Sequence, residues 1–394
     1  MAGAIRPEPV TRLLRLVLTN FRNYERLTWE PAGTPVVITG DNGSGKTNLL
    51  EALSLLAPGR GLRGARNADL RRHSSETDRA DSGWGVTARF SDDRGAFDVA
   101  TGMEAEQEGA RKFLLNGTTL RARTAIADYL SAVWITPQMD RLFGESASGR
   151  RRFLDRLVVA MAPHHARELA ACERATAQRN RVLATQSTDP AWLSGIEDAM
   201  ARHGVATIAA RQDLVARLNA AGADPTGAFP SAQLSLICPV AERLKTEPAL
   251  AVEDWLRARL RAARDKDRLR GHATLGAHRT DFALRDLQTG RFAAEASTGQ
   301  QKALLIGVIL AHARLMGSLG TTAPMLLLDE PLVHLDVIRR AALMNTLLDF
   351  RTPVLMTGTD PEPFAPLRDN ALFVRLHNGI LGSDGEGQEI TRPA

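Results

Sequence analysis

The segment GDNGSGKTN, residues 40–48, combines residue types that bind phosphate groups. Its glycines let backbone N–H groups turn inward around phosphate oxygens, and the amphipathic helix expected from Asn48 onward adds partial positive charge at its N-terminus. Lys46 would reach the β- and γ-phosphates of ATP, and Thr47 would hold Mg²⁺. The pattern G-x-x-x-x-G-K-[ST] therefore predicts an ATP-binding loop made of Gly40, Asp41, Asn42, Gly43, Ser44, Gly45, Lys46, Thr47 and Asn48.

Two acidic residues follow a second apolar run and could supply the metal ligand and the general base that a phosphate-binding loop lacks. Residues 325–328, MLLL, predict a buried central strand, and Asp329 and Glu330 come directly after it. The carboxyl ends of strands are where open α/β sheets bind ligands. Asp329 would hold Mg²⁺ through water, and Glu330 would orient or deprotonate the attacking water. Lys46 and Glu330 are thus the predicted catalytic residues, and the predicted metal contacts are Thr47, Asp329 and Gln138.

Three further polar groups stand at the ends of expected elements. The STGQ segment, defined as Ser297, Thr298, Gly299 and Gln300, opens a helical run and is either a plain helix cap or an anion site. Thr357, Thr359 and Asp360 end a third apolar strand, within reach of the same sheet edge. Asp336 lies near the start of a helix over 334–350, where it either opposes the helix dipole or belongs to the site.

The order of these motifs resembles the head of ABC-type ATPases. The resemblance implies an α/β P-loop ATPase head with a mixed sheet and a parallel core. It also implies that the STGQ segment caps the γ-phosphate held by a second subunit, with Asp336, Thr359 and Asp360 as the contacts of the turn and switch. Two chains would then sandwich two ATP molecules, and each chain would carry half of each site.

A long insertion separates the loop from the acid pair. Lys46 and Asp329 lie 283 positions apart, and residues 163–270 carry apolar side chains at spacings of three and four, which predicts an almost wholly helical block. We therefore expect three parts: the first part of the ATPase head over 1–162, a helical arm over 163–270, and the second part of the head over 271–394.

The amino-acid composition limits the class of protein and the kinds of partner that are possible. The 394 residues are 44% hydrophobic and 24% charged, which is ordinary for a soluble globular protein. Cys172 and Cys238 offer no disulfide framework, and the longest apolar run, at 303–311, is too short to span a bilayer. We expect a cytoplasmic protein with no membrane partner. The net charge of +5 permits nucleic acid as a partner, while the 5% aromatic content argues against a platform for stacking single-stranded bases.

Motifs along nearly the whole chain resemble the RecF family of DNA replication and repair proteins, which are ABC-type ATPases related to SMC heads. The motifs are LRLVLTNFRNYERLTWE at 14–30, GRGLRGAR at 59–66, RRRFLDRLV at 150–158, LGAHRTDF at 275–282, STGQQK at 297–302 and MLLLDEPLVHLD at 325–336. Family members often carry Asp-Asp where this chain has Asp329 and Glu330, and the longer glutamate is like the base of other ABC ATPases.

The resemblance also implies partners. RecF-like proteins are weak, DNA-stimulated ATPases that dimerise on ATP, bind DNA at single-strand gaps, duplexes or junctions, and act with RecR and RecO to help load RecA. Basic clusters are the candidate DNA contacts: Arg60, Arg63, Arg66, Arg150, Arg151 and Arg152. Each cluster is equally typical of a solvated surface, but arginines on DNA would contact phosphates and carry no sequence information.

Two other functions remain open at this stage. A transporter ATPase subunit would need a membrane partner and a much shorter interval between the loop and the acid pair. An ABC-type ATPase of a nuclease-linked defence system would need an additional carboxylate-rich metal domain, for which the chain has no room after FVRLHNGILG at 373–382.

Overall fold

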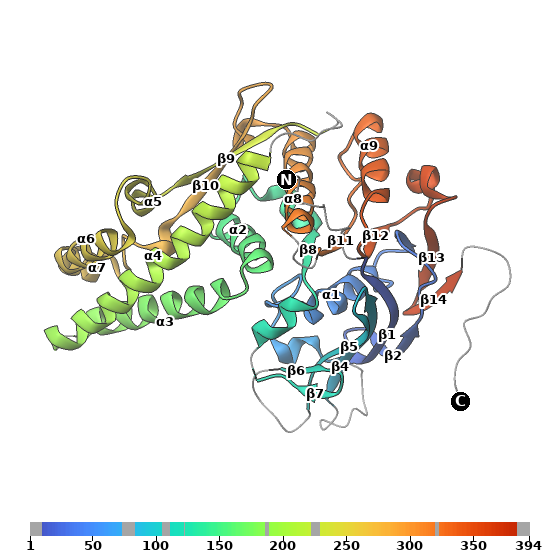
Figure 1. The fold of residues 1–394 in the computed structure, drawn as a ribbon, viewed down its shortest axis with the longest axis horizontal. Coiled ribbons are helices and arrows are strands. Elements are labelled where there is room, and N and C mark those ends of the chain that lie inside the picture. Colours follow the sequence, from blue (N-terminus) through green and yellow to red (C-terminus); the bar gives the residue numbers. More distant parts are fainter. Residues whose placement is uncertain are drawn as a thin grey trace, which may run out of the picture. The chain divides into compact units, whose positions relative to one another are not determined.

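The computed structural model describes residues 10–72, 83–104, 111–121, 123–185, 189–221, 229–319 and 323–383 (Figure 1). The chain divides into two compact units. The first unit consists of Met1–Asp140, Asp224–Phe229 and Leu305–Ala394, and the second consists of Arg141–Ala223 and Pro230–Leu304. The second unit includes more residues than the helical arm expected over 163–270. The division into a functional head and arm stays a prediction.

The first unit contains an antiparallel sheet in the order β2-β1-β4-β5-β6-β7. Its central strands alternate buried and more exposed residues, as in the pattern of β4, because only one face packs on the core. The strands are β1 (Arg12–Phe21), β2 (Tyr24–Trp29), β4 (Trp84–Asp92), β5 (Gly95–Met103), β6 (Lys112–Leu115) and β7 (Thr118–Thr119).

A second sheet of the same unit has the order β14-β13-β3-β12-β11-β8 and is parallel except for the β13–β14 pair. All residues of β3, β8, β11 and β12 are buried, which explains their continuous apolar runs. The strands are β3 (Val36–Thr39), β8 (Ala132–Ile135), β11 (Met325–Leu328), β12 (Val354–Gly358), β13 (Leu372–His377) and β14 (Ile380–Ser383).

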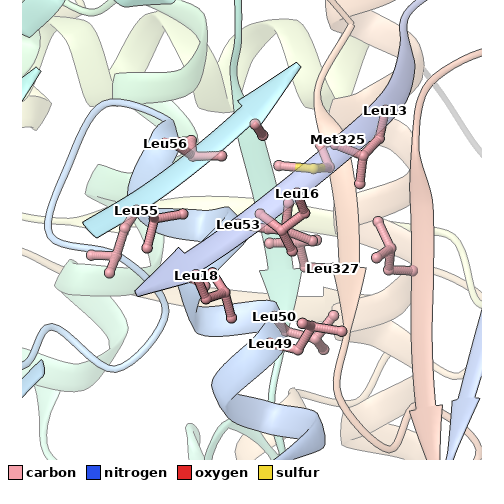
Figure 2. Packing of buried hydrophobic residues seen from close by; sticks show 14 of the residues in the cluster. Leu13, Leu16, Leu18, Leu49, Leu50, Leu53, Leu55, Leu56, Met325 and Leu327 are labelled. Carbon is pink, nitrogen blue, oxygen red and sulfur yellow. The ribbon is translucent and has the colours of Figure 1, made fainter. Parts of the chain in front are cut away.

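Helix α1 (Lys46–Leu56) joins the two sheets into one core. Leucines of α1 lie among Leu16 and Leu18 of β1 and Met325 and Leu327 of β11 (Figure 2). Burying α1 on nearly all sides fixes the direction of its N-terminus, and that end carries the predicted ATP-binding loop. Helix α9 (Val337–Leu348) also belongs to this unit, and α8 (Thr298–Ser318) crosses the division at Leu305.

The second unit is mainly helical, with one two-stranded antiparallel sheet. The strand β9 corrects the expectation of an almost wholly helical block, because Leu234 and Leu236 alternate with the exposed Gln233, Ser235 and Ile237 and pair with Leu284 and Phe282 of β10. Its elements are α2 (Ala147–Met161), α3 (His165–Ala184), α4 (Pro190–Ala221), β9 (Ala232–Ile237), α5 (Pro239–Leu244), α6 (Ala249–Ala262), α7 (Arg264–Arg270) and β10 (Asp281–Asp286). Of the helices described in either unit, none is both long and apolar enough to cross a membrane.

A fully buried ion network ties the helices of the second unit together. Arg179 of α3 lies 3.0 Å from Glu197 of α4 and 2.6 Å from Asp267 of α7, measured between nitrogen and carboxylate oxygen. Its third nitrogen donates to the carbonyl oxygen of Leu260 at 2.7 Å. Every nitrogen of this guanidinium therefore has a partner, which is the condition under which a buried charge is tolerated.

Replacing Arg179 with alanine should destabilise the second unit severely. The substitution leaves Glu197 and Asp267 as buried charges with one partner fewer, which costs about 3–5 kcal/mol of unfolding free energy. Arg217→Ala is the control, because the Arg217–Asp213 pair is about half exposed and contributes about 0.5 kcal/mol. Guanidinium denaturation followed by helical circular dichroism measures both. Equal losses in the two variants would show that the buried network does not stabilise the unit.

Candidate nucleotide-binding site

The loop between β3 and α1 has a backbone that requires its glycines. Gly40, Gly43 and Gly45 have φ values of 147°, 84° and 112°. A Cβ atom on Gly40 would lie 2.2 Å from the carbonyl oxygen of Leu376, and one on Gly45 would lie 2.5 Å from the side-chain amide of Asn23. No side chain fits at these two positions, so the glycines allow both the turn and the close approach of neighbouring elements.

Residues from the β1–β2 turn hold the carbonyl side of this loop. Asn23 Nδ2 donates to the carbonyl oxygen of Ser44 at 3.2 Å, and the hydroxyl of Tyr24 donates to that of Gly45 at 2.9 Å. Asn48 donates in turn to Asn23 Oδ1 at 2.8 Å. Burial raises the pKa of the Tyr24 hydroxyl above its ordinary value. Neither Asn23 nor Tyr24 is among the site residues predicted from the sequence, although both lie in the motif NFRNY.

Lys46 lies folded into the loop. Its ammonium group donates to the carbonyl oxygens of Gly40 and Asp41, at 2.5 and 2.9 Å. Burial lowers the pKa of Lys46, while the nearby carboxylates of Glu330, Asp329 and Asp41 oppose that effect. The charge of Lys46 thus lies at the centre of the loop, where phosphate oxygens would be bound.

Asp329 joins the loop to the neighbouring strands. Thr47 Oγ1 lies 3.0 and 2.9 Å from the two carboxylate oxygens of Asp329, and Thr357 Oγ1 donates to Asp329 Oδ1 at 2.7 Å. Asp329 follows β11 and Thr357 lies near the end of β12, while Thr47 lies in the first turn of α1, the helix after β3. The adjacent parallel strands β3, β12 and β11 therefore bring these residues together. The backbone N–H of Glu330 donates to the same threonine hydroxyl at 3.0 Å.

These residues fit ATP and magnesium. Ser44 Oγ is buried and has no hydrogen-bond partner among the described residues, as expected for a group that faces a ligand oxygen. Thr47 and Asp329 supply only oxygen donors, the ligands that Mg²⁺ prefers.

Known proteins resemble the chain over most of its length. The domain family described as RecF/RecN/SMC N terminal domain matches residues 12–361. The DNA replication and repair protein RecF of Mesorhizobium japonicum is 44% identical over 376 residues, covering 94% of this chain and 98% of its own length. The RecF of Rhizobium rhizogenes is 43% identical over 373 residues, with 94% and 98% covered.

The chain belongs to the RecF family.

Solved structures confirm the predicted fold class of this RecF-family chain. The structure of the recombination mediator protein RecF-ATPrS in the RecFOR pathway matches with a TM-score of 0.81 at 21% identity, covering 95% of this chain and 99% of its own. An SMC head bound to the C-winged helix domain of ScpA matches with a TM-score of 0.50 at 16% identity, covering 94% and 97%. The relation to SMC heads implied by the RecF-family resemblance is therefore confirmed at the level of the fold.

Three other predicted residues follow strands of the parallel sheet, Thr359 directly after β12, Gln138 after β8 and Asp336 at the start of α9. The carbonyl oxygen of Thr359 accepts from the N–H of Gly40 at 3.4 Å, and its hydroxyl donates to Asp360 at 2.9 Å. Gln138 is exposed in the 3₁₀ helix Pro137–Arg141 after β8, the strand that pairs with β11. Asp336 caps α9 by accepting from the N–H of Arg339 at 2.8 Å. The cap interpretation of Asp336 thus has a direct contact, and its role towards nucleotide stays a prediction.

The STGQ segment of this RecF-family chain belongs to the second unit and forms a capping box at the start of α8. The N–H of Ser297 donates to Gln300 Oε1 at 3.0 Å, and Ser297 Oγ accepts from the N–H of Gln300 at 3.4 Å. Ser297, Thr298 and Gln300 are nonetheless exposed. A helix cap and a surface anion site are therefore compatible in this segment.

The predicted DNA contacts of this RecF-family chain differ in exposure and in internal pairing. Arg60, Arg63, Arg66 and Arg152 are exposed. Three of the six contact groups of their own unit: Arg63 contacts Asn48 and Glu51, Arg150 forms a bidentate ion pair with Asp281, and Arg151 donates to the carbonyl oxygen of Thr280. Internal pairing makes Arg150 a structural link between α2 and β10, although its sequence context looks like a basic surface.

Proposed function

We propose that the chain is an ATP-dependent DNA-binding protein of replication and recombinational repair that hydrolyses ATP weakly, with stimulation by DNA. The observation that carries the proposal is the contact set of Asp329 beside the predicted phosphate-binding loop. Membership in the RecF family favours this function over a transporter subunit or a nuclease-linked ATPase.

In this proposal, each step of ATP binding and hydrolysis is assigned to a particular residue. Lys46 and the N-terminus of α1 would supply positive charge for the phosphates, and Thr47 and Asp329 would hold the magnesium ion. Magnesium neutralises part of the triphosphate charge when it is bound. Glu330 accepts a proton from the attacking water, and its backbone is held by the buried hydroxyl of Thr357.

A second copy of the chain completes the site in this proposal. The exposed STGQ segment offers a hydroxyl and backbone N–H groups at the start of a 21-residue helix, which is the arrangement that binds anionic groups. In a dimer with two-fold symmetry, each segment would meet the nucleotide of the other chain. ATP would then link two chains, and hydrolysis would release them.

DNA is the third partner. The net charge of +5 and the exposed Arg60, Arg66 and Arg152 support contacts to the phosphate backbone. The proposed substrates are duplex DNA, single-strand gaps and junctions in the cytoplasm. The further proposed partners, by kinship with the RecF family, are RecR, RecO and, functionally, RecA.

DNA binding should be steeply salt-dependent, largely independent of base sequence and tighter with ATP than with ADP. Arginine contacts to phosphates release counterions, so the logarithm of the association constant falls linearly with the logarithm of salt concentration. The slope of this line is about −0.9 per phosphate contact. The double variant Arg60→Ala/Arg66→Ala should lower the magnitude of that slope by about 1 for each phosphate that the variant can no longer neutralise. Fluorescence anisotropy of a gapped duplex, titrated at several salt concentrations with each nucleotide, measures the effect.

Arg94→Ala is the control for this titration, since Arg94 is an exposed arginine outside the predicted set, paired with Asp92. It should leave the slope unchanged. A slope near zero for the wild-type chain, a strong preference for one base sequence, or equal affinity with ATP and ADP would contradict the proposed function.

A further inference from the structure

Thr357 stands between the two acids of the site and touches both. It is fully buried near the end of β12. Its hydroxyl donates to Asp329 Oδ1 at 2.7 Å and accepts from the backbone N–H of Glu330 at 3.0 Å. The register of the parallel strands pairs Leu328 with Met356, so the next residues along each strand, Asp329 and Thr357, come to lie side by side.

We propose that Thr357 is a positioning residue for ATP hydrolysis, which fixes Glu330 relative to the metal-binding carboxylate of Asp329. The inference rests on the proposed function and extends it to Thr357, which the sequence predicts at the sheet edge without assigning it a role. Thr357 acts through the two acids, because its hydroxyl is already engaged with both of them.

The direction of these hydrogen bonds is determined by the groups themselves. An ionised carboxylate only accepts and a backbone N–H only donates, whereas a hydroxyl does both. The Glu330 N–H therefore donates to the Thr357 hydroxyl, and that hydroxyl donates to the Asp329 carboxylate. Among the side chains of similar size, only a hydroxyl can make both contacts at once, and valine, which has the same shape, can make neither.

The backbone at Glu330 explains why such a support is needed. Glu330 has a φ of 49°, in the left-handed region that residues other than glycine seldom adopt. On the other side of the acid pair, the N–H of Asp329 donates to the carbonyl oxygen of Ile135 at 2.9 Å. The two backbone contacts hold the turn from both sides, and full burial of Thr357 leaves no room for water to replace its hydroxyl.

The test compares Thr357→Val with Thr357→Ser. Losing a hydrogen bond to a charged group that must be held in place should lower kcat by about 10- to 100-fold in the valine variant. The dissociation constant for ATP should change by less than about threefold, because Lys46 and the loop are untouched. Serine keeps the hydroxyl and should restore kcat to within about threefold of the wild type. Steady-state phosphate release and equilibrium binding of a fluorescent ATP analogue give the two values.

Thr352→Val is the matched control. Thr352 is a buried threonine just before β12, and its hydroxyl donates to the carbonyl oxygen of Pro324 at 3.0 Å, away from the acid pair. This variant should lower the melting temperature with no effect on kcat. If the valine variant at 357 does not fold, Thr357→Ala replaces it, since alanine also lacks the hydroxyl.

The outcomes separate the inference from the proposed function. A wild-type chain that binds ATP and does not hydrolyse it, with or without DNA, contradicts the proposed ATPase and the role of Thr357 together. A wild-type chain that hydrolyses ATP, beside a valine or alanine variant with the same kcat, overturns the role of Thr357 alone. The same conclusion follows if serine fails to restore kcat, because Thr357 would then only fill the core.

Discussion

Lys46→Ala should abolish ATP binding, whereas Glu330→Gln should bind ATP as well as the wild type does and lose hydrolysis. Lys46 brings its ammonium group to the centre of the loop, at hydrogen-bond distance from the carbonyl oxygens of Gly40 and Asp41. Removing it removes the charge that would face the phosphates. Glutamine at 330 keeps the shape of the side chain and cannot accept the proton of the attacking water.

Two assays separate these effects. Equilibrium binding of a fluorescent ATP analogue should give no signal for Lys46→Ala and a wild-type affinity for Glu330→Gln. Phosphate release in the presence of gapped duplex DNA should fall by about 100-fold or more in the glutamine variant, which is the range expected for a lost general base. If Glu330→Gln hydrolyses ATP at the wild-type rate, Glu330 is not the base.

Mixing two inactive variants should restore activity. Lys46→Ala damages the loop that a chain offers its own nucleotide, and Ser297→Arg blocks the cap that it offers to its partner. In a mixed dimer, one site receives both lesions and the other receives neither. Random mixing makes half of the dimers mixed, so about a quarter of the wild-type sites should return, by two-fold symmetry alone.

ATPase activity is the readout of the mixing experiment, titrated at fixed total protein concentration. Formation of mixed dimers is checked separately with differently tagged chains, because cooperation between sites would lower the recovery. Ser297→Arg alone must be inactive with DNA present. If it hydrolyses ATP normally, the exposed STGQ segment is only the capping box seen at the start of α8.

The local motifs of the site were predictable from sequence because each motif consists of consecutive residues whose types and spacing indicate its chemistry. The loop over 40–48 and the strand before Asp329 both combine composition and spacing that few other structures satisfy. The structure brings Thr47 and Asp329, which are 282 positions apart, into hydrogen-bond contact. The short apolar runs with polar residues at their ends correctly predicted the buried parallel strands, and the motifs correctly predicted the fold class.

Contacts between distant elements could not be read from the sequence. Asn23 and Tyr24 hold the loop only because the β1–β2 turn lies against it. Arg63 and Arg150 resemble surface residues in sequence, and tertiary partners occupy their guanidinium groups. Thr357 could be expected at the edge of the sheet, but its position between Asp329 and Glu330 depends on the register of two strands.

Whether ATP joins two copies of this chain can be measured by sedimentation velocity of the Glu330→Gln chain, since that variant should hold ATP without hydrolysing it. With ATP and Mg²⁺ we expect a dimer, stabilised further by gapped duplex DNA. With ADP, or with Lys46→Ala under the same conditions, we expect a monomer. A Glu330→Gln chain that is saturated with ATP and still sediments as a monomer, with and without DNA, would contradict the claim that ATP joins two copies of this chain.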